Sequence, residues 1–223
     1  ILAEELLKQG YSFISTSQRL SGQIKILQRA ETAVANAYLE PIIHSYISNI
    51  QRGLQHAQLR IMTSAGGLVN AQHFLPKDSL LSGPAGGVVG AATVAKFSGV
   101  DQLITFDMGG TSTDVSLYNK QFTYRYESKV GEIKIFSPSL AIETIAAGGG
   151  SICEFDGHRL TVGPQSAGAS PGPACYGSGG PLTVTDVNLL LGRAEVEFFS
   201  IPLYRKKSEE ALENLLEKIK RVT

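Results

Sequence analysis

The stretch that decides the fold is "LITFDMGGTSTDVSL", residues 103–117. Two short apolar runs flank a turn with two glycines, three hydroxyl side chains and two carboxylates, and this pattern predicts a β-hairpin. Gly109 and Gly110 lack Cβ atoms, so a ligand can approach the backbone closely there. A plain two-strand turn needs only one or two small residues. The additional hydroxyls and acids therefore indicate a ligand site, with a polar turn that binds nothing as the alternative.

The residues of this turn suit a phosphate group and a divalent cation. Thr111, Ser112 and Thr113 offer hydroxyls and backbone N–H groups that can form a concave set of donors for phosphate. Asp107 and Asp114 would repel a phosphate unless a cation lay between them. Mg²⁺ is typically held by one or two carboxylates together with phosphate oxygens. We therefore predict that Asp107 and Asp114 are catalytic residues that hold the metal, although Asp107 could instead orient a nucleophilic water.

Composition limits the class of protein. The chain has 223 residues, of which 43% are hydrophobic and 18% charged, as in a soluble globular protein. Twenty basic residues balance twenty acidic ones, so electrostatics gives no reason to expect nucleic acid or an acidic membrane surface as a partner. No apolar run reaches about 18 residues, so no transmembrane helix is expected. Two cysteines without metal-ligand spacing predict a reduced, cytoplasmic protein. Zinc is not expected, because the four histidines are scattered: His44, His56, His73 and His158.

The order of predicted elements indicates an α/β protein whose mixed sheet contains antiparallel hairpins flanked by helices. The expected elements are an amphipathic piece (1–10), a helix (24–55) that Pro41 kinks or restarts, a strand with a glycine turn (59–68), a small-residue helix (82–99), the quoted hairpin (102–118), strands (121–128 and 132–136), a hairpin turning at Asp156-Gly157, a Gly/Pro-rich segment (162–180), a short helix (183–193) and a helix (208–222) capped by Ser208.

The segment 162–180 is open to two interpretations, a flexible linker or an ordered functional loop that carries Cys175 and Tyr176. Cys175 could be a nucleophile, but no histidine lies near it in the sequence to activate it. Cys153 is expected to be a buried strand residue. Asp186 is expected to cap the short helix, with a substrate or metal role as the alternative.

The motif "FDMGGTSTDVSLY" (106–118) resembles the second phosphate motif of the hydantoinase A and 5-oxoprolinase family, which belongs to the actin-like ATPase superfamily. Further blocks resemble that family in the expected order, and together they cover residues 20 to 200. They are "AETAVANAYLEPIIHSYI" (30–47), "IMTSAGGL" (61–68), "LLSGPAGGVVGA" (80–91), "AAGGGSI" (146–152), "VGPQSAGASPGPACYGSGG" (162–180) and "PLTVTDVNLLLGR" (181–193).

The resemblance implies a ribonuclease H-like fold that uses ATP and Mg²⁺ to open a cyclic amide, such as 5-oxoproline or a hydantoin. ATP would phosphorylate the amide oxygen, and a hydantoinase B-type subunit or domain would complete the reaction. Two alternatives stay open: the ATPase subunit of an acetone-type ketone carboxylase, and a non-catalytic actin-like regulatory or scaffolding protein. Asp107, Gly109, Gly110, Thr111, Thr113 and Asp114 match the motif residue by residue. We therefore expect Gly109, Gly110, Thr111 and Thr113 to bind the nucleotide, together with Ser112 for its hydroxyl, and Asp107 and Asp114 to serve in catalysis and metal binding.

Two blocks expected of this family are missing from the sequence: a first phosphate motif upstream and an adenosine-binding block downstream. The sequence therefore predicts a central fragment, a single partial ATPase-like domain over residues 1–223. It would comprise a helical lead-in (1–60), a core with the phosphate hairpin (61–200) and a C-terminal helix (201–223). One phosphate loop cannot enclose a triphosphate, so these residues alone are expected to be inactive and to bind ATP weakly or not at all. Exposed apolar surface predicts self-association, and the protein is expected to be an oligomer.

Overall fold

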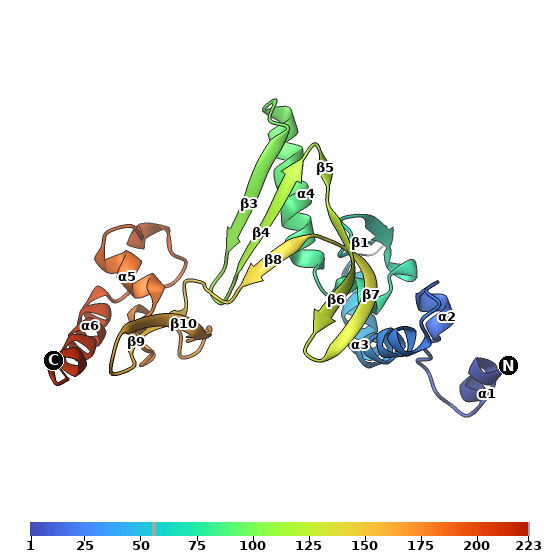
Figure 1. Cartoon of the computed structure of the whole chain (residues 1–223), viewed down its shortest axis with the longest axis horizontal. Helices are drawn as coiled ribbons and strands as arrows, with labels where there is room; N and C mark the ends of the chain where they lie inside the picture. Colours follow the sequence, from blue (N-terminus) through green and yellow to red (C-terminus); the bar gives the residue numbers. More distant parts are fainter. Residues whose placement is uncertain (55–56, 223) are drawn as a thin grey trace. The chain divides into compact units, whose positions relative to one another are not determined.

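The computed structural model describes residues 1–54 and 57–222, which fall into two compact units (Figure 1). The first unit comprises Ile1–Thr105 and Ser116–Ile142, and the second comprises Phe106–Val115 and Glu143–Thr223. The end of the predicted 24–55 helix and His56 lie outside the described residues. The assignment of the whole chain to one partial ATPase domain stays a prediction.

The first unit holds four α-helices and the larger share of the strands. Its helices are α1 (Leu2–Lys8), α2 (Ser17–Leu20), α3 (Ile26–Gly53) and α4 (Ser82–Phe97), with 3₁₀ turns η1 (Ala71–His73) and η2 (Pro76–Ser79). Its strands are β1 (Arg60–Met62), β2 (Leu68–Asn70), β5 (Gln121–Phe122), β6 (Tyr124–Val130) and β7 (Ile133–Leu140), with most of β3 (Gln102–Met108) and β4 (Thr113–Asn119). β1 pairs with β2 and β6 with β7, both antiparallel, and a further sheet has the order β3-β4-β5 with β8 (Ile142–Ile145) paired to β4.

Helix α3 packs through polar side chains. Thr32 and Asn36 are buried, and each bonds to the backbone of a neighbouring element. The Thr32 hydroxyl accepts a hydrogen bond from the Phe136 N–H of β7 (3.0 Å), and Asn36 Oδ1 accepts one from the Lys77 N–H of η2 (3.0 Å). The helix continues through Pro41, so the predicted restart there is wrong.

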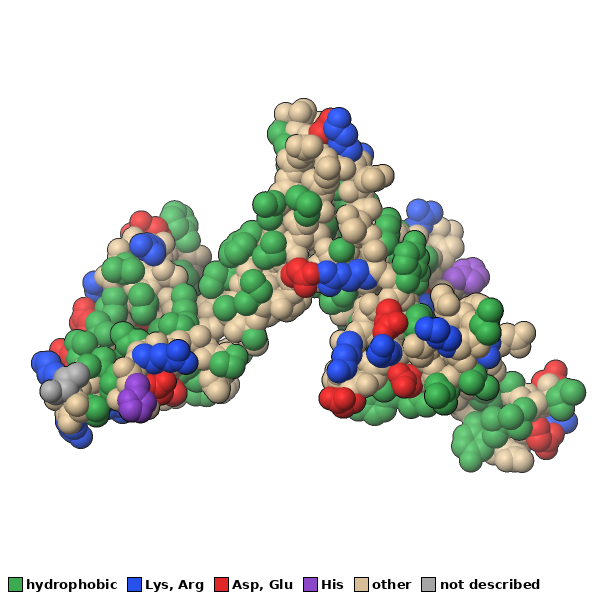
Figure 2. Space-filling model, in the orientation of Figure 1, with side chains coloured by type: hydrophobic (Ala, Val, Ile, Leu, Met, Phe, Trp, Pro, Cys, Tyr) green, Lys and Arg blue, Asp and Glu red, His purple; other side chains and the backbone are tan. Residues whose placement is uncertain are grey.

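Several large apolar residues of α3 are exposed, although Ala35 is buried. Leu27, Val34 and Tyr38 are 77%, 67% and 75% exposed, although their spacing is that of a helix face that packs against a core. Figure 2 likewise shows hydrophobic side chains over much of the visible surface. This exposure agrees with the expected self-association, which stays a prediction.

The buried apolar core of the first unit joins helix α4 to the end of strand β7. Ala85 and Val88 of α4 pack against Leu140 and Ile142. Ala85 and Ala92 of α4 are buried and Gly86, Ala91 and Ala95 are half-buried, so the helix can approach the sheet closely. The predicted helix over 82–99 is confirmed, with Gly99 just past its end at a φ of +70° that favours glycine.

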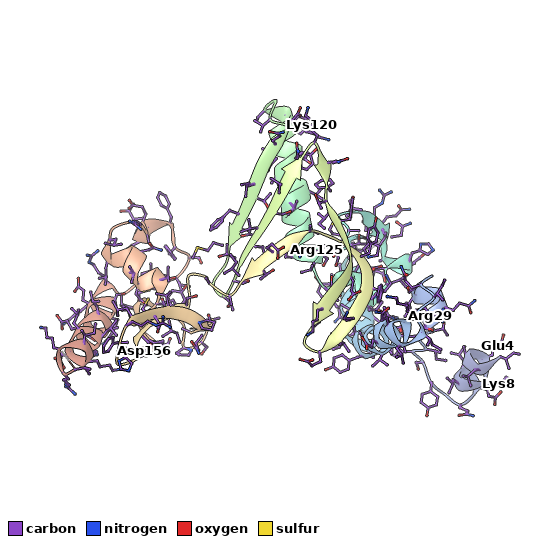
Figure 3. All side chains as sticks on the ribbon, in the orientation of Figure 1. Glu4, Lys8, Arg29, Lys120, Arg125 and Asp156 are labelled. Atoms are coloured by element: carbon purple, nitrogen blue, oxygen red, sulfur yellow. The ribbon has the colours of Figure 1, made fainter. Side chains whose placement is uncertain are left out.

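The β3–β4 hairpin has one uninterrupted register along its length. Four links establish it: they join Asp101 to Lys120, Gln102 to Asn119, Thr105 to Ser116 and Gly109 to Ser112. In Figure 3, Lys120 marks the end of β4 that is far from the glycine turn. The same register places Asp107 opposite Asp114, and residues opposite each other in an antiparallel pair project from the same face.

The second unit contains the turn of that hairpin. Its elements are β8, β9 (Ser151–Phe155), β10 (Leu160–Ser166), η3 (Ala174–Tyr176), α5 (Val184–Leu190), η4 (Val196–Phe198) and α6 (Arg205–Lys220). β9 and β10 form the predicted hairpin, and Asp156, labelled in Figure 3, closes its turn by accepting hydrogen bonds from the N–H groups of His158 and Arg159, both at 2.9 Å. These two bonds hold the pKa of the Asp156 carboxyl below its usual value.

The predicted α/β class, with antiparallel hairpins flanked by helices, is confirmed. Two element predictions are corrected. The single strand over 121–128 is split between β5 and β6, which belong to different sheets. The last helix begins at Arg205, and Ser208 lies inside it rather than capping it. Among the residues that the structure describes, no helix is long and apolar enough to cross a lipid bilayer.

Candidate functional site

The candidate site is the turn between β3 and β4, which we call the hairpin turn (residues 109–112). The Gly109 N–H donates to the Ser112 carbonyl at 2.9 Å and closes the turn. That N–H is therefore not available to a ligand. Gly109 contributes to binding only the space that its missing side chain leaves. Gly110 and Thr111 are exposed at the tip and Ser112 is half-buried, so a ligand can reach all three.

The two carboxylates form an acid pair (Asp107 and Asp114) on one face of the hairpin. Residues directly opposite in an antiparallel pair have Cβ atoms roughly 5 Å apart, and like charges there are destabilising. Asp107 is exposed and Asp114 is half-buried. Asp114 accepts a hydrogen bond from the Thr144 hydroxyl of β8 at 2.6 Å, which orients one of its oxygens. Two carboxylates close together on one face of a hairpin are a suitable place for a cation.

The hairpin turn rests on a glycine loop (residues 148–150). The Gly149 N–H donates to the Gly109 carbonyl at 3.0 Å, and the Gly150 N–H donates to the Gly110 carbonyl at 2.6 Å. The buried Thr113 hydroxyl donates to the Ala147 carbonyl at 2.5 Å, just before the loop. These three bonds hold the backbone of the turn, so the loop sets where the exposed tip lies.

Each residue of the glycine loop has to be glycine for lack of space. A Cβ on Gly148 would lie 2.6 Å from the Gly109 carbonyl oxygen and 2.7 Å from the Gly110 carbonyl carbon. A Cβ on Gly149 would lie 2.8 Å from Thr185 Oγ1, and one on Gly150 would lie 2.9 Å from the Gly110 oxygen. Such distances are shorter than real Cβ contacts, so a side chain at Gly148 or Gly150 would displace the hairpin turn, and one at Gly149 would displace Thr185.

The first turn of helix α5 holds the glycine loop from its other side. The N–H and the hydroxyl of Thr185 both donate to the Gly149 carbonyl, each at 2.8 Å. The helix itself begins with a capping box, in which Thr183 and Asp186 satisfy each other's backbone N–H groups. The predicted role of Asp186 as a helix cap is therefore confirmed.

The Asp186 carboxylate also joins three segments of the second unit. It is fully buried and accepts hydrogen bonds from the segment before α5, from η3 and from helix α6. The donors are Thr183 N–H (2.8 Å), Thr183 Oγ1 (2.9 Å), Ala174 N–H (3.1 Å), Cys175 N–H (2.7 Å) and Ser208 Oγ (2.7 Å). Burial alone would raise the pKa of Asp186, but the bonds from Ser208, the Cys175 backbone and Thr183 outweigh it and lower that pKa. Residues 174–176 are thus ordered, which favours an ordered loop over a linker.

Replacing Asp186 by asparagine should lower the free energy of unfolding by about 2 kcal/mol, because an amide cannot accept from five donors. The loss should depend on pH. The pKa of Asp186 is lower in the folded protein than in the unfolded chain. Its carboxylate therefore stabilises the fold fully at a pH above the unfolded pKa, and this contribution is lost as the pH falls through the folded pKa. Urea unfolding at pH 7 and at pH 3 should therefore show a smaller difference between wild type and D186N at the lower pH. An equal difference at both would contradict the argument.

Cys175 is not suited to be a nucleophile. The thiol is fully buried, and burial together with the hydrogen bond to Asp186 raises its pKa to about 12. The thiolate, which is the reactive form, is therefore scarce near neutral pH. Cys153 lies on β9 as expected, although it is half-buried rather than buried, and burial raises its pKa too.

The structure brings all seven predicted site residues into one hairpin. Gly110, Thr111 and Ser112 lie at the tip, Asp107 and Asp114 pair below it, and Gly109 and Thr113 are engaged in holding the turn. Sequence reasoning missed the glycine loop, Thr144 and Thr185 as neighbours of the site. Three consecutive glycines were the available signal for the loop, whereas nothing local marks either threonine. No group of three or more His, Cys, Asp or Glu that could hold a metal occurs within residues 1–54 and 57–222.

Comparison with known proteins identifies the class to which this fold and turn belong. Residues 29–222 match the family described as Hydantoinase/oxoprolinase. The 5-oxoprolinase of Saccharomyces cerevisiae is 46% identical over 209 residues, which are 92% of this chain and 16% of the yeast protein. The caprolactamase subunit alpha of Pseudomonas jessenii is 40% identical over 190 residues, 81% of this chain and 27% of that protein.

Two solved structures have the same fold. The ATP-dependent caprolactamase from Pseudomonas jessenii superimposes with a TM-score of 0.76 at 32% identity, covering 99% of this chain and 37% of that one. Nucleotide-free acetone carboxylase superimposes with a TM-score of 0.79 at 24% identity, covering 99% of this chain and 34% of that one, and at this identity it supports the fold alone. This chain belongs to the hydantoinase/oxoprolinase family. It spans about one sixth of the length of the yeast relative, 16%.

Proposed function

We propose that the full-length protein carrying these residues is an ATP-dependent hydrolase that opens a cyclic amide. The main support is family membership together with relatives named for cyclic amides, 5-oxoprolinase and caprolactamase, the latter described as ATP-dependent. In this proposal the γ-phosphoryl group of ATP is transferred to the amide oxygen, which releases ADP and activates the amide carbon. Water adds to that carbon, and the C–N bond then breaks with protonation of the ring nitrogen, which leaves the opened chain as an acyl phosphate. A second water hydrolyses the acyl phosphate to the ring-opened acid and phosphate.

The hairpin turn is the proposed phosphate-binding site. The exposed Gly110, Thr111 and Ser112 would supply donors to the phosphate oxygens, while Gly109 and Thr113 would keep the turn in shape. The acid pair fits Mg²⁺, because its two carboxylates share one face and Mg²⁺ accepts one or two carboxylates plus phosphate oxygens. Mg²⁺, when bound, would neutralise charge on the phosphates. Asp107, the more exposed acid, would be the closer to the reacting phosphate or its attacking water.

The substrate and the partner follow from the relatives. Both 5-oxoproline and caprolactam are lactams, so a lactam or the related hydantoin ring is the proposed substrate class. The caprolactamase relative is named a subunit alpha, so we propose a second subunit or domain, of the hydantoinase B type, that completes the reaction. The likeness to acetone carboxylase lies at 24% identity, which supports fold rather than substrate, so ketone carboxylation is the weaker candidate.

The full-length protein, with its partner subunit where one exists, should hydrolyse ATP faster when a cyclic amide is present. We expect at least tenfold stimulation by 5-oxoproline, caprolactam or hydantoin, measured as phosphate release beside release of the ring-opened product. ATP hydrolysis that depends instead on acetone and bicarbonate would refute the proposal and identify a ketone carboxylase. If calorimetry detected no binding of Mg-ATP to the full-length protein, the non-catalytic actin-like alternative would be favoured.

A further inference from the structure

We propose that Thr185 is a positioning residue that holds the hairpin turn in its phosphate-binding geometry, acting through the glycine loop. The inference rests on the proposed function for what the turn binds. It adds a residue that lies outside the phosphate motif, on a different element of the fold. Thr185 lies in the first turn of helix α5 (Val184–Leu190), and its side chain is half-buried.

The geometry of one peptide plane carries the argument. The carbonyl of Gly149 and the N–H of Gly150 belong to the same planar, trans peptide, so they point in opposite directions and rotate together. Thr185 holds the carbonyl end with two donors, its N–H and its hydroxyl, each at 2.8 Å. The N–H end donates to the Gly110 carbonyl at 2.6 Å. Fixing one end of this plane therefore fixes the bond at the other end.

Glycine makes this support necessary. Gly149 and Gly150 have no side chains to restrict φ and ψ, so their peptide planes can rotate more freely than those of other residues. Close approach to the hairpin excludes side chains from the loop. The restraint has to come from outside it, and Thr185 supplies two of the bonds. The Thr185 N–H is itself held in place because it lies in the first turn of the helix that Thr183 and Asp186 cap.

The test compares a substitution that removes the Thr185 hydroxyl with one that keeps it. Thr185→Val keeps the shape and the backbone N–H but removes the hydroxyl, whereas Thr185→Ser keeps the hydroxyl. In the full-length protein we expect kcat/KM for ATP to fall about tenfold in T185V and to stay within about twofold of wild type in T185S, since tenfold corresponds to the loss of one well-placed hydrogen bond. Thr161→Val is the matched control, because the Thr161 hydroxyl is exposed and bonds within the β9–β10 hairpin at 3.4 Å.

Hydrogen exchange provides a second readout that does not depend on ATP. The amides of residues 148–150 should exchange about tenfold faster in T185V than in wild type, T185S or T161V. Wild-type exchange and wild-type kcat/KM in T185V would overturn the proposal, as would equal impairment of T185S and T185V. A wild-type protein without ATP turnover would refute the proposed function instead, and the exchange measurement would then decide whether Thr185 holds the turn.

Discussion

Replacing Asp107 by asparagine should reduce ATP turnover by the full-length protein by roughly two to three orders of magnitude. Asp107 is one of two carboxylates that the β3–β4 register places opposite each other, and in the proposed function these hold Mg²⁺ against the phosphates. Asparagine keeps the size of the side chain and one oxygen but removes the charge that attracts the cation. The measurement is phosphate release at saturating Mg²⁺ and cyclic amide.

The same substitution should leave the protein at least as stable as wild type. Two like charges directly opposite in a sheet repel each other, so removal of one relieves a destabilising interaction when no cation is bound. Thermal unfolding without Mg²⁺ should therefore give a Tm equal to or slightly above that of wild type. Loss of turnover together with retained stability identifies a functional carboxylate rather than a structural one.

Asp101→Asn is the control for charge on the same hairpin. Asp101 is exposed at the end of β3 far from the turn, where its carboxylate lies 3.9 Å from the Lys120 ammonium. Turnover by D101N should match wild type within about twofold, because exposed ion pairs contribute little. If D107N hydrolysed ATP as fast as D101N, the assignment of the acid pair to the metal would be wrong.

Replacing Gly148 by alanine in the full-length protein should abolish ATP binding and destabilise the second unit by about 3 kcal/mol or more. The new methyl group would lie 2.6 Å from the Gly109 oxygen and 2.7 Å from the Gly110 carbonyl carbon. Both neighbours are backbone atoms, so neither can turn aside as a flexible side chain would. Either the glycine loop or the hairpin turn has to move, and each move breaks bonds between them. Calorimetry with Mg-ATP and urea unfolding measure the two effects.

Gly90→Ala gives the matched comparison for a glycine-to-alanine change. Gly90 lies inside helix α4, and a Cβ there would meet no atom within 4 Å. Alanine is the better helix residue, so G90A should stabilise the protein by up to about 1 kcal/mol and leave ATP binding unchanged. Wild-type ATP affinity in G148A would show that the loop does not support the turn.

Local sequence determined much of the fold and the identity of the candidate residues. The hairpin over 102–118, the helix over 82–99, the β9–β10 turn at Asp156-Gly157 and the cap at Asp186 all follow from short-range rules of turn and cap chemistry, and the structure agrees with each. The seven predicted site residues could be identified in the same way, because their oxygens and missing side chains lie within eight consecutive positions.

Helix α3 shows a feature that short-range rules do not predict. Its apolar spacing predicts the helix but does not say which face is covered. The buried face carries two polar residues beside Ala35, because Thr32 and Asn36 meet backbone N–H groups of β7 and η2 that need acceptors. Those partners lie 104 and 41 residues away along the chain, so no local pattern could indicate them.

The support of the site was likewise decided by tertiary structure. The sequence by itself specified a turn with glycines, hydroxyls and acids, and so what that turn could bind. Only the folded chain brought residues 148–150 beneath the turn and Thr185 beneath those, over separations of about 40 residues each. The physical reason is that three of these four contacts join backbone groups, the exception being the Thr185 hydroxyl. Every residue carries the same N–H and carbonyl, so their partners depend on how the chain packs rather than on which side chains it has.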